Sequence, residues 1–301
     1  MLGGVEAGGT KFVCAIGTGP QDLRAQAQIE TTTPEETIAR TIGFFTATGF
    51  DPIEALGVAS FGPIDRDPAS ATWGRITSTP KAGWAQADLA AALGKALGVP
   101  VGFDTDVNGA ALAEHRWGSA RGLSTFIYVT VGTGIGGGAM VEGRLLHGLM
   151  HPEMGHVRVT RRPGDHLSSV CPFHSWCLEG LASGPAIEAR WGARAETLPL
   201  DHPAWRLEAD YLAQGLANLV CTLSPERIVL GGGVMKQVQL FPLVRRELRR
   251  MLNGYIESDL IEGESEAFVG PPGLGGRAGA LGAIALAERV LGGSQNPAHR
   301  V

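Results

Sequence analysis

Short apolar runs that end at glycine or proline divide this chain into separate elements. The run at 5–16 is interrupted by a Gly-Gly pair, which predicts a strand, a tight turn and a second strand. The same plan returns further along, with β-forming residues at 125–131, a glycine-rich stretch at 132–138 and apolar residues through Val141. Two such hairpins in one chain indicate a duplicated architecture.

Strand patterns and helical patterns alternate along the chain, which predicts an α/β protein. The segment 151–180 follows neither pattern and is expected to be irregular. The expected further strands are 55–60, 99–103 and 227–230, and the expected helices are 85–97, 106–117, 203–223, 241–253 and 278–291.

Composition narrows the class of protein. The 301 residues suggest about two domains, and the formal charge of −5 comes without a basic block that would bind nucleic acid. No apolar run approaches the ~18–20 residues of a membrane span, and the N-terminus lacks the features of a signal peptide. Four cysteines are too few for a disulfide scaffold, so a cytoplasmic protein is expected. The 44 glycines, about twice the ~21 of an average chain, need a structural reason.

The glycine turns are candidate phosphate-binding sites. Residues 132–137 satisfy G-x-G-x-x-G, but a strand is expected after them instead of the helix that an NAD-binding fingerprint requires. This disfavours an NAD-dependent oxidoreductase, and the chain contains no P-loop motif. A hairpin turn with little side-chain bulk can approach a polyphosphate and donate backbone hydrogen bonds to it. Thr10 and Thr133 could add hydroxyl groups and Lys11 a cation, although plain hairpin turns remain the alternative.

Two further clusters follow the ends of predicted strands. Gly231, Gly232 and Gly233 come after 227–230 and leave room for a flat ring or a ribose, unless they only allow close helix packing. Asp104 to Asn108 lies where a strand gives way to a helix, and one aspartate there could simply be an N-cap. A carboxylate at this end of a strand could also take a proton from a substrate hydroxyl.

A zinc site is predicted within the irregular segment. Cys171, His174 and Cys177 form Cys-x₂-His-x₂-Cys, and His156 lies fifteen residues before the first cysteine. Four nitrogen and sulfur ligands suit tetrahedral, structural zinc. The neighbouring His151 and His166 are expected at the surface. Cys14 and Cys221 lie in apolar runs, so we expect them to be small core residues.

Taken together, these segments resemble the ROK family of sugar kinases, within the hexokinase–actin–Hsp70 superfamily, and in particular its bacterial fructokinase branch. The match covers nearly the whole chain. The segments that carry it are 6–11, 78–84, 104–108, 132–138, 151–156, 171–184 and 225–233.

The resemblance implies two actin-like (ribonuclease H-like) α/β domains around a cleft. The first would cover 1–118 and be joined by a last helix at about 285–301, and the second would cover 119–284. It also implies ATP and Mg²⁺ as cofactors, alongside Zn²⁺, and transfer of the γ-phosphoryl group to a hexose hydroxyl. The expected partners are therefore small molecules, with no nucleic acid and no membrane, and we expect a homodimer.

The family pattern assigns roles to individual residues. Asp106 resembles the catalytic base, and Glu153, His156 and Glu179 resemble the sugar-contacting residues, with His156 also a zinc ligand. The ATP site would comprise the phosphate turns and the adenosine site, which are Gly8, Gly9, Thr10, Lys11, Gly132, Thr133, Gly134, Gly136, Gly231, Gly232 and Gly233.

Three positions depart from the wider family pattern. Glu6 stands where aspartate is usual, Thr105 stands where a sugar-contacting asparagine is common, and His174 stands where a third cysteine is common. The last two differences favour fructose as the substrate and fructose 6-phosphate as the product. The change from asparagine to Thr105 also puts the sugar contact at this position in question. The alternatives are a glucokinase or mannokinase of the same family. A sugar-responsive repressor is disfavoured, because only a few residues precede the first phosphate turn and those repressors carry a helix-turn-helix there.

Overall fold

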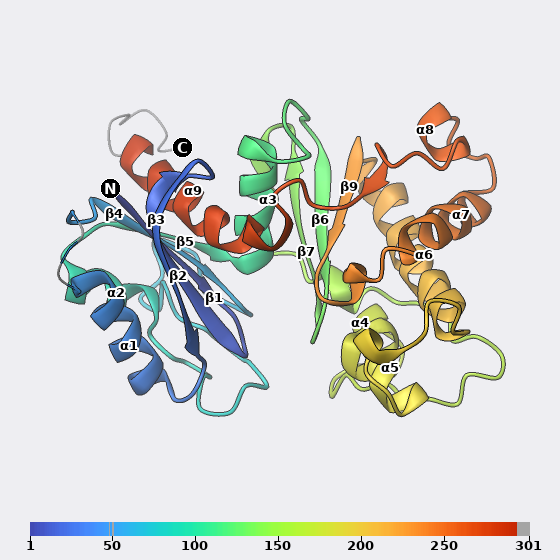
Figure 1. Ribbon diagram of the computed structural model, residues 1–301, viewed down its shortest axis with the longest axis horizontal. Helices are drawn as coiled ribbons and strands as arrows, with labels where there is room; N and C mark the ends of the chain where they lie inside the picture. Colours follow the sequence, from blue (N-terminus) through green and yellow to red (C-terminus); the bar gives the residue numbers. More distant parts are fainter. Residues whose placement is uncertain (48, 50, 294–301) are drawn as a thin grey trace. The chain divides into compact units, whose positions relative to one another are not determined.

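The computed structural model describes residues 1–47, 49 and 51–293, which form two compact units (Figure 1). Unit 1 comprises Met1–Gly118, His147–His151 and the chain from Gly276 onward, and unit 2 comprises Ser119–Leu146 and Pro152–Gly275. The chain therefore returns to unit 1 twice, and its final return begins earlier than the expected 285. Residues 294–301 of the expected returning segment lie outside the described residues.

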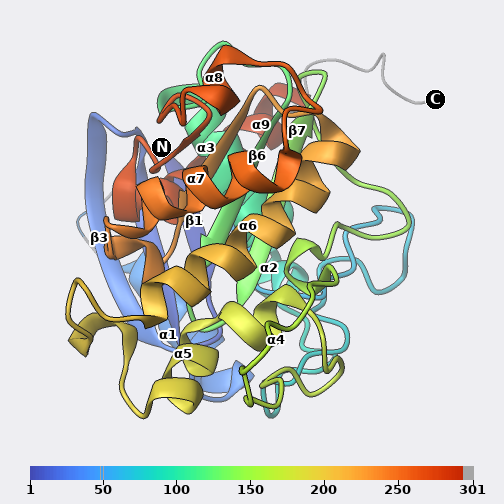
Figure 2. The same ribbon diagram turned by 90° about the vertical axis from the view of Figure 1, so that its right-hand side faces the viewer.

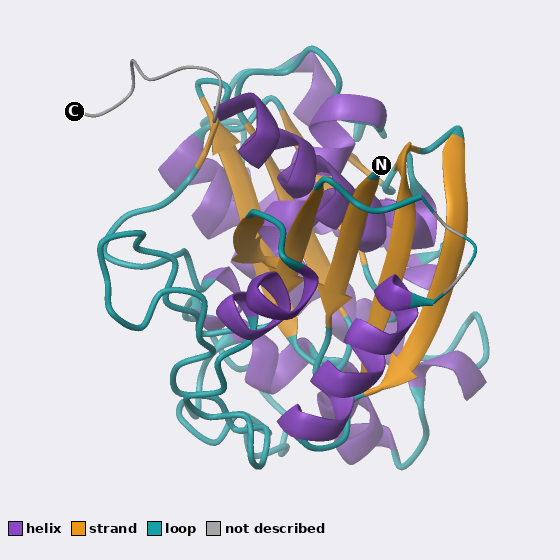
Figure 3. Cartoon of the chain, turned by 90° about the vertical axis from the view of Figure 1, so that its left-hand side faces the viewer, coloured by secondary structure: helices purple, strands orange, loops and turns teal. Residues whose placement is uncertain are grey.

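Unit 1 is built on a five-stranded sheet whose order is β3-β2-β1-β4-β5 (Figure 3). The first three strands form an antiparallel meander, and β4 and β5 continue the sheet parallel to β1. The strands are β1 (Leu2–Ala7), β2 (Lys11–Gly19), β3 (Asp22–Glu30), β4 (Ala55–Ser60) and β5 (Val101–Thr105).

The sheet of unit 2 repeats this connectivity, with the order β10-β9-β6-β7-β8. Here β6, β7 and β8 form the antiparallel meander, and β9 and β10 add in parallel beside β6. The duplicated architecture expected from the two hairpins is thus confirmed. The strands are β6 (Phe126–Val131), β7 (Ile135–Val141), β8 (Arg144–Leu145), β9 (Arg227–Gly231) and β10 (Val269–Gly270).

A row of glycines explains how the last helix reaches the sheet of unit 1. Gly4, Gly57 and Gly102 are direct neighbours in the register of β1, β4 and β5. A Cβ atom at Gly57 would collide with the carbonyl oxygen of Ala283 in α9 (Ala278–Gly293), and one at Gly4 would lie 3.0 Å from a backbone nitrogen of α9. The α9 backbone therefore lies directly on the strands (Figure 1).

The other helices of unit 1 complete its two faces. Phe45 of α1 lies near Gly3, on the side of the sheet that faces away from α9. The helix α3 crosses α9 so closely that a Cβ atom on Gly282 would collide with the backbone of Gly109. The bounds are α1 (Pro34–Thr46), α2 (Ala90–Leu97) and α3 (Asp106–Trp117).

Unit 2 has a separate apolar core beneath α6 and α7, which pack side by side (Figure 2). None of the helices in the described part of the chain combines the length and the apolar character that a membrane crossing requires. The bounds are α4 (Leu178–Ala182), α5 (Gly184–Trp191), α6 (Ala204–Leu223), α7 (Leu240–Leu252) and α8 (Asp259–Glu262), with 3₁₀ turns η1 (Met154–His156), η2 (Ala195–Thr197), η3 (Val234–Lys236) and, leading into α9, η4 (Gly275–Arg277).

Most predicted elements are confirmed, but one helix begins later than expected and several elements were not predicted. The helix expected at 85–97 begins only at Ala90, because Gln86 has a left-handed φ of 64° and Asp88 forms a bridge with Arg75. The strand β3 and the helix α1 were not predicted, and neither were the shorter elements β8, β10, α4, α5 and α8. In β3 the exposed positions are polar and only one residue is buried, whereas α1 carries a readable signal in Thr33, which accepts a hydrogen bond from the Glu36 N–H.

Candidate active site

Asp106 is the first residue of α3, directly after the strand β5. The N-cap of this helix is Thr105, whose Oγ1 accepts the Asn108 N–H at 3.2 Å, so capping does not explain the aspartate. The side chain is only partly buried, and burial raises the pKa of Asp106 to about 6, against the Val107 N–H that its Oδ1 accepts at 2.9 Å. A carboxylate with this pKa is suited to take up a proton near neutral pH.

Glu6, at the end of β1, is electrostatically coupled to Asp106 within unit 1. Burial, followed by repulsion from Asp106, raises the pKa of Glu6 to about 7, while Lys11 opposes the shift. The Glu6 carboxylate lies against Gly279 in the first turn of α9, where no side chain would fit. Two carboxylates that repel each other in this way form a donor set that a divalent cation would stabilise.

The first glycine turn joins β1 to β2 in unit 1. The Gly8 N–H donates to the Lys11 carbonyl at 3.0 Å and closes the turn. Gly9, Thr10 and Lys11 are exposed, and a Cβ atom on Gly9 would meet nothing within 4 Å. The turn is therefore accessible to a ligand along its whole length.

The second glycine turn and the glycines after β9 come together in unit 2. The Gly132 N–H donates to the Gly134 carbonyl at 2.8 Å, and a Cβ atom on Gly132 would lie 3.8 Å from the nitrogen of Gly233. Gly232 has a φ of 96°, and a Cβ atom there would collide with the backbone of Val131. Close packing thus explains Gly232, while Gly233 has open space around it. Of the remaining predicted ATP residues, Thr133 is exposed and Gly136 and Gly231 lie within β7 and β9.

Glu179 of α4 contacts this second turn. Its Oε2 accepts the Ile135 N–H at 3.0 Å, and the same oxygen would lie 2.7 Å from a Cβ atom on Gly134. Glu153 is exposed just before η1, where its carbonyl accepts the His156 N–H at 3.0 Å. Two predicted sugar residues, Glu153 and Glu179, therefore belong to unit 2, whereas Thr105 lies in unit 1 with 4% of its surface exposed.

The four predicted zinc ligands are brought together in unit 2. The donor atoms of His156, Cys171, His174 and Cys177 all lie within 4.8 Å of one another. Cys171 Sγ is 3.9 Å from His156 Nδ1 and 3.7 Å from His174 Nδ1, close to the roughly 3.6 Å between sulfur and nitrogen ligands of tetrahedral zinc.

The Cys177 thiol of this cluster is fully buried. Burial and, to a smaller extent, nearby Cys171 raise the pKa of the Cys177 thiol to about 12, against the Gly180 N–H that donates to Cys177 Sγ at 3.3 Å. The Cys177 thiolate would therefore be unfavourable without a bound metal, which is the arrangement expected of a zinc site.

A buried polar network beside Asp106 was missed by the sequence analysis. Asp104 is 4% exposed, and its carboxylate accepts hydrogen bonds from His147 Nε2, Asn108 Nδ2 and the Thr105 N–H, each at 2.8 Å. Burial opposes ionisation, but these hydrogen bonds outweigh it and hold the pKa of Asp104 below its usual value. The sequence had indicated Asp104 as part of a candidate cluster, but no local pattern connects this residue to His147.

Two expectations about single residues were wrong. His151, expected at the surface, is 9% exposed, and its Nε2 accepts the Ile64 N–H at 3.1 Å. Cys221, expected in the core, lies on the exposed side of α6, whereas Cys14 is buried and His166 is exposed, as predicted. Apolar neighbours in sequence do not determine which side of a helix a cysteine takes.

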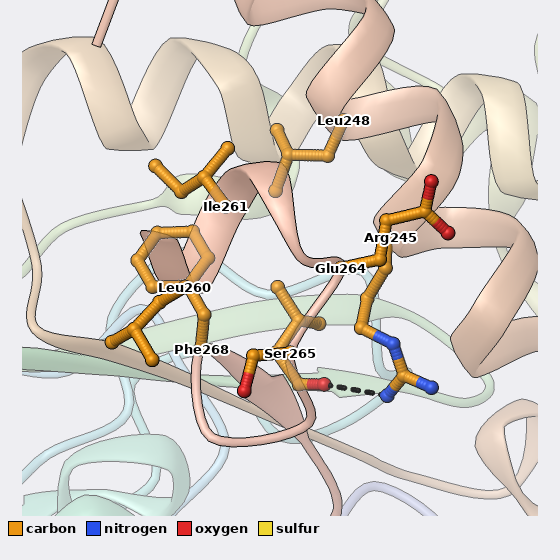
Figure 4. A pocket seen from close by; sticks show the side chains of 8 residues that line it. Arg245, Leu248, Leu260, Ile261, Glu264, Ser265 and Phe268 are labelled. Atoms are coloured by element: carbon orange, nitrogen blue, oxygen red, sulfur yellow. Dashed lines mark hydrogen bonds between the residues drawn. The ribbon is translucent and has the colours of Figure 1, made fainter. Parts of the chain in front are cut away.

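A cavity between α7, α8 and β10 is separate from these residues (Figure 4). Arg245 reaches across it to the Val269 carbonyl at 3.1 Å, and Phe268 and Leu260 form part of its wall. Its volume of about 10 Å³ has room for at most one water molecule. This cavity therefore does not compete with the predicted site for a substrate.

Comparisons with known proteins agree over nearly the whole chain. The model of the ROK family matches residues 2–290. The fructokinase of Zymomonas mobilis is 45% identical over 293 residues, covering 95% of this chain and 96% of the relative. The fructokinase of Pediococcus pentosaceus is 42% identical over 291 residues, covering 97% and 99%. A ROK family glucokinase from Streptomyces griseus, solved in complex with glucose and AMPPNP, superposes with a TM-score of 0.77 at 26% identity over 96% of this chain and 99% of that one.

Proposed function

This chain belongs to the ROK family, and we propose that it is an ATP-dependent fructokinase that converts D-fructose to fructose 6-phosphate. Curated fructokinases at 42% and 45% identity over nearly their full length support this substrate. The proposed chemistry rests on the position of Asp106. This aspartate is the first residue of α3, it is not needed as the N-cap of the helix, and its carboxyl group has a pKa of about 6.

In the proposed reaction Asp106 accepts the proton of the attacking sugar hydroxyl. Phosphoryl transfer depends chiefly on positioning and on stabilisation of charge, and a carboxylate held near the hydroxyl removes its proton as the new bond to phosphorus forms. Glu153, His156, Glu179 and Thr105 are the proposed sugar-binding residues. The Thr105 hydroxyl oxygen already accepts the Asn108 N–H, so it would bind sugar mainly as a donor.

The two glycine turns are the proposed phosphate-binding elements. The turn of unit 1 comprises Gly8, Gly9, Thr10 and Lys11, and the turn of unit 2 comprises Gly132, Thr133, Gly134 and Gly136. The last glycines, Gly231 to Gly233, would lie beside the adenosine. The close approach of Gly132 to Gly233 supports a shared nucleotide site in unit 2.

Mg²⁺ is the cation proposed for Glu6 and Asp106, because their mutual repulsion calls for a positive charge. When bound, it would neutralise charge on the transferred phosphoryl group. Zn²⁺ is proposed for His156, Cys171, His174 and Cys177. Four protein ligands complete its coordination, so this metal would be structural and would hold the segment 151–180 in place.

Glucokinase activity is the alternative, since the Streptomyces griseus relative was solved with glucose. A coupled assay with ATP over a panel of fructose, glucose and mannose tests the proposal. We expect the highest kcat/KM with fructose. Higher kcat/KM with glucose would instead assign the chain to the glucokinases, and no ATP turnover with any hexose would contradict the kinase function.

We also propose a homodimer that acts in the cytoplasm. The cytoplasmic location is supported by the few cysteines, none of which forms a disulfide. Sedimentation equilibrium of the purified protein tests the oligomeric state, and a mass of one chain at micromolar concentration would contradict it.

A further inference from the structure

The amide of Ile135 lies at the point where the second glycine turn becomes the strand β7. Ile135 pairs with Val131 across the hairpin, so the three residues between them form the whole turn. Two of these three residues are glycines, which lose more conformational freedom than any other residue when they are ordered. The position of this turn therefore depends on what holds its two ends.

The segment that carries the sugar and zinc residues holds Ile135 on both sides of its backbone. Glu179 Oε2 accepts the Ile135 N–H at 3.0 Å. Gly155, between Glu153 and His156, packs so closely on the Ile135 carbonyl that a side chain there would collide with it. One residue of β7 is thus fixed through its N–H by α4 and through its C=O by η1.

The Glu179 carboxylate also lies directly beside the turn. Its Oε2 is 2.7 Å from the position that a Cβ atom of Gly134 would occupy. The residue comes two positions after Cys177, which is the N-cap of α4 and whose Sγ accepts the Gly180 N–H. The metal cluster, the carboxylate and the turn therefore form one continuous set of contacts within unit 2.

We propose that Glu179 is a positioning residue for the phosphate turn 132–134, in addition to its place in the sugar site. This inference rests on the proposed kinase function. Its carboxylate accepts the Ile135 N–H, so the turn is already ordered before the nucleotide binds. The conformational entropy of the glycines is then lost during folding and does not weaken nucleotide binding. The metal cluster acts on the same turn, because it fixes the start of α4.

The sign of the effect separates this role from the alternatives. A carboxylate near phosphates repels them, so its removal would tighten nucleotide binding if charge were its only influence. A residue that contacts only the sugar would leave nucleotide binding unchanged. A residue that positions the turn predicts the opposite outcome, weaker nucleotide binding when the carboxylate is lost.

The test is calorimetric titration of the purified protein with Mg²⁺ and ADP in the absence of any sugar. We expect Kd for ADP to rise about tenfold in Glu179→Ala. It should rise only two- to threefold in Glu179→Gln, whose amide oxygen still accepts the Ile135 N–H. Glu188→Gln, which removes an exposed carboxylate on α5, is the matched control and should leave Kd unchanged. Gly134→Ala should reproduce the loss, because its methyl group displaces the carboxylate.

A second measurement covers the case of a poorly folded variant. Amide exchange at Ile135, followed by NMR in Glu179→Gln, should accelerate at least fivefold while exchange in α6 stays the same. An unchanged or lower Kd for ADP in folded Glu179→Ala would overturn the positioning role while leaving the kinase assignment intact. A wild-type protein that binds no ADP and phosphorylates no hexose would overturn both.

Discussion

His147 Nε2 lies 2.8 Å from Asp104 Oδ2, a contact between residues 43 positions apart in the chain. Both side chains are largely buried, with 18% and 6% of their surface exposed. The contact attaches the short segment 147–151 to the strand that leads into Asp106. We therefore expect His147 to stabilise unit 1 rather than to take part in the chemistry.

His147→Ala should lower the free energy of unfolding by about 2 kcal/mol, because it leaves a buried charged acceptor with one partner fewer. Urea denaturation of the whole protein, followed by tryptophan fluorescence, measures this loss. His166→Ala is the control, since His166 is exposed, and it should change the value by less than about 0.5 kcal/mol. Equal unfolding free energies for the two variants would show that the Asp104 contact contributes nothing.

Asp106→Asn should reduce kcat by about 10²–10⁴-fold, because the amide keeps the shape of the side chain but does not accept the hydroxyl proton. Fructose binding, measured by calorimetry, should survive. Asp88→Asn serves as the control because Asp88 is an exposed aspartate of the same unit. Near wild-type kcat in Asp106→Asn would remove the base from the proposed mechanism.

The pKa of Asp106 gives the activity a predictable dependence on pH. Since the carboxylate must be ionised to accept a proton, kcat/KM should fall tenfold per unit as the pH drops below about 6. A pH profile with fructose as the varied substrate measures this limb. A profile that stays flat from pH 7 to pH 5 would contradict the assignment.

The raised pKa of Asp106 also means that its ionised carboxylate lowers the stability of the folded protein. The folded state holds this proton more tightly than the unfolded state, so stability is lost as the pH rises from about 4 through about 6. At pH 8, the free energy of unfolding of Asp106→Asn should therefore exceed that of the wild type by about 1–3 kcal/mol, and the variant should unfold at a higher temperature. The difference should vanish near pH 4, and a variant that is less stable at pH 8 would refute this.

Removal of the metal should loosen unit 2 locally before it unfolds. Purified protein should contain one zinc per chain, and chelation should increase exchange within 151–180 while the sheets stay protected. The KM for fructose should rise, and Cys177→Ser should reproduce the effect. Cys221→Ser, at an exposed position outside the cluster, should not. Elemental analysis without zinc, or full activity of Cys171→Ser/Cys177→Ser, would exclude the site.

Gly57→Ala should destabilise unit 1 by about 3 kcal/mol or more, because the added methyl group collides with the backbone of α9 at Ala283. The matched control is Gly43→Ala in α1, where nothing lies within 4 Å of the new atom. That change should stabilise the protein by up to about 1 kcal/mol through better helix propensity. Thermal unfolding of both variants compares the two glycines directly, and equal shifts would argue against the close contact.

The elements that sequence predicted best are those whose signals are local. The helix α3 begins at Asp106, as expected from the strand that ends directly before it, although its N-cap is Thr105 rather than an aspartate. Spacing also predicted that His156, Cys171, His174 and Cys177 lie together, and the structure brings their donor atoms within 4.8 Å of one another. Whether they bind zinc stays a prediction. The start of α2 was predicted wrongly, because the bridge of Asp88 to Arg75 depends on a residue outside the helix.

The contacts that sequence did not predict join distant segments. Glu179 was expected to face the sugar, and nothing near it in the chain indicates the hydrogen bond to Ile135, 44 residues away. His151 likewise gave no sign of the Ile64 N–H, which is 87 residues away. Such pairings are decided by the packing of η1 and α4 on β7 and of 147–151 on unit 1, which a local pattern does not contain.

The glycine row under α9 has a consequence for the order in which the protein is made. Residues 1–118 leave the ribosome first, but the face formed by Gly4, Gly57 and Gly102 stays open until the chain beyond Gly276 has been translated. All of unit 2 is synthesised in that interval and can complete its own core. The unit that begins first is thus completed last, and until then this face of its sheet lacks the helix that covers it.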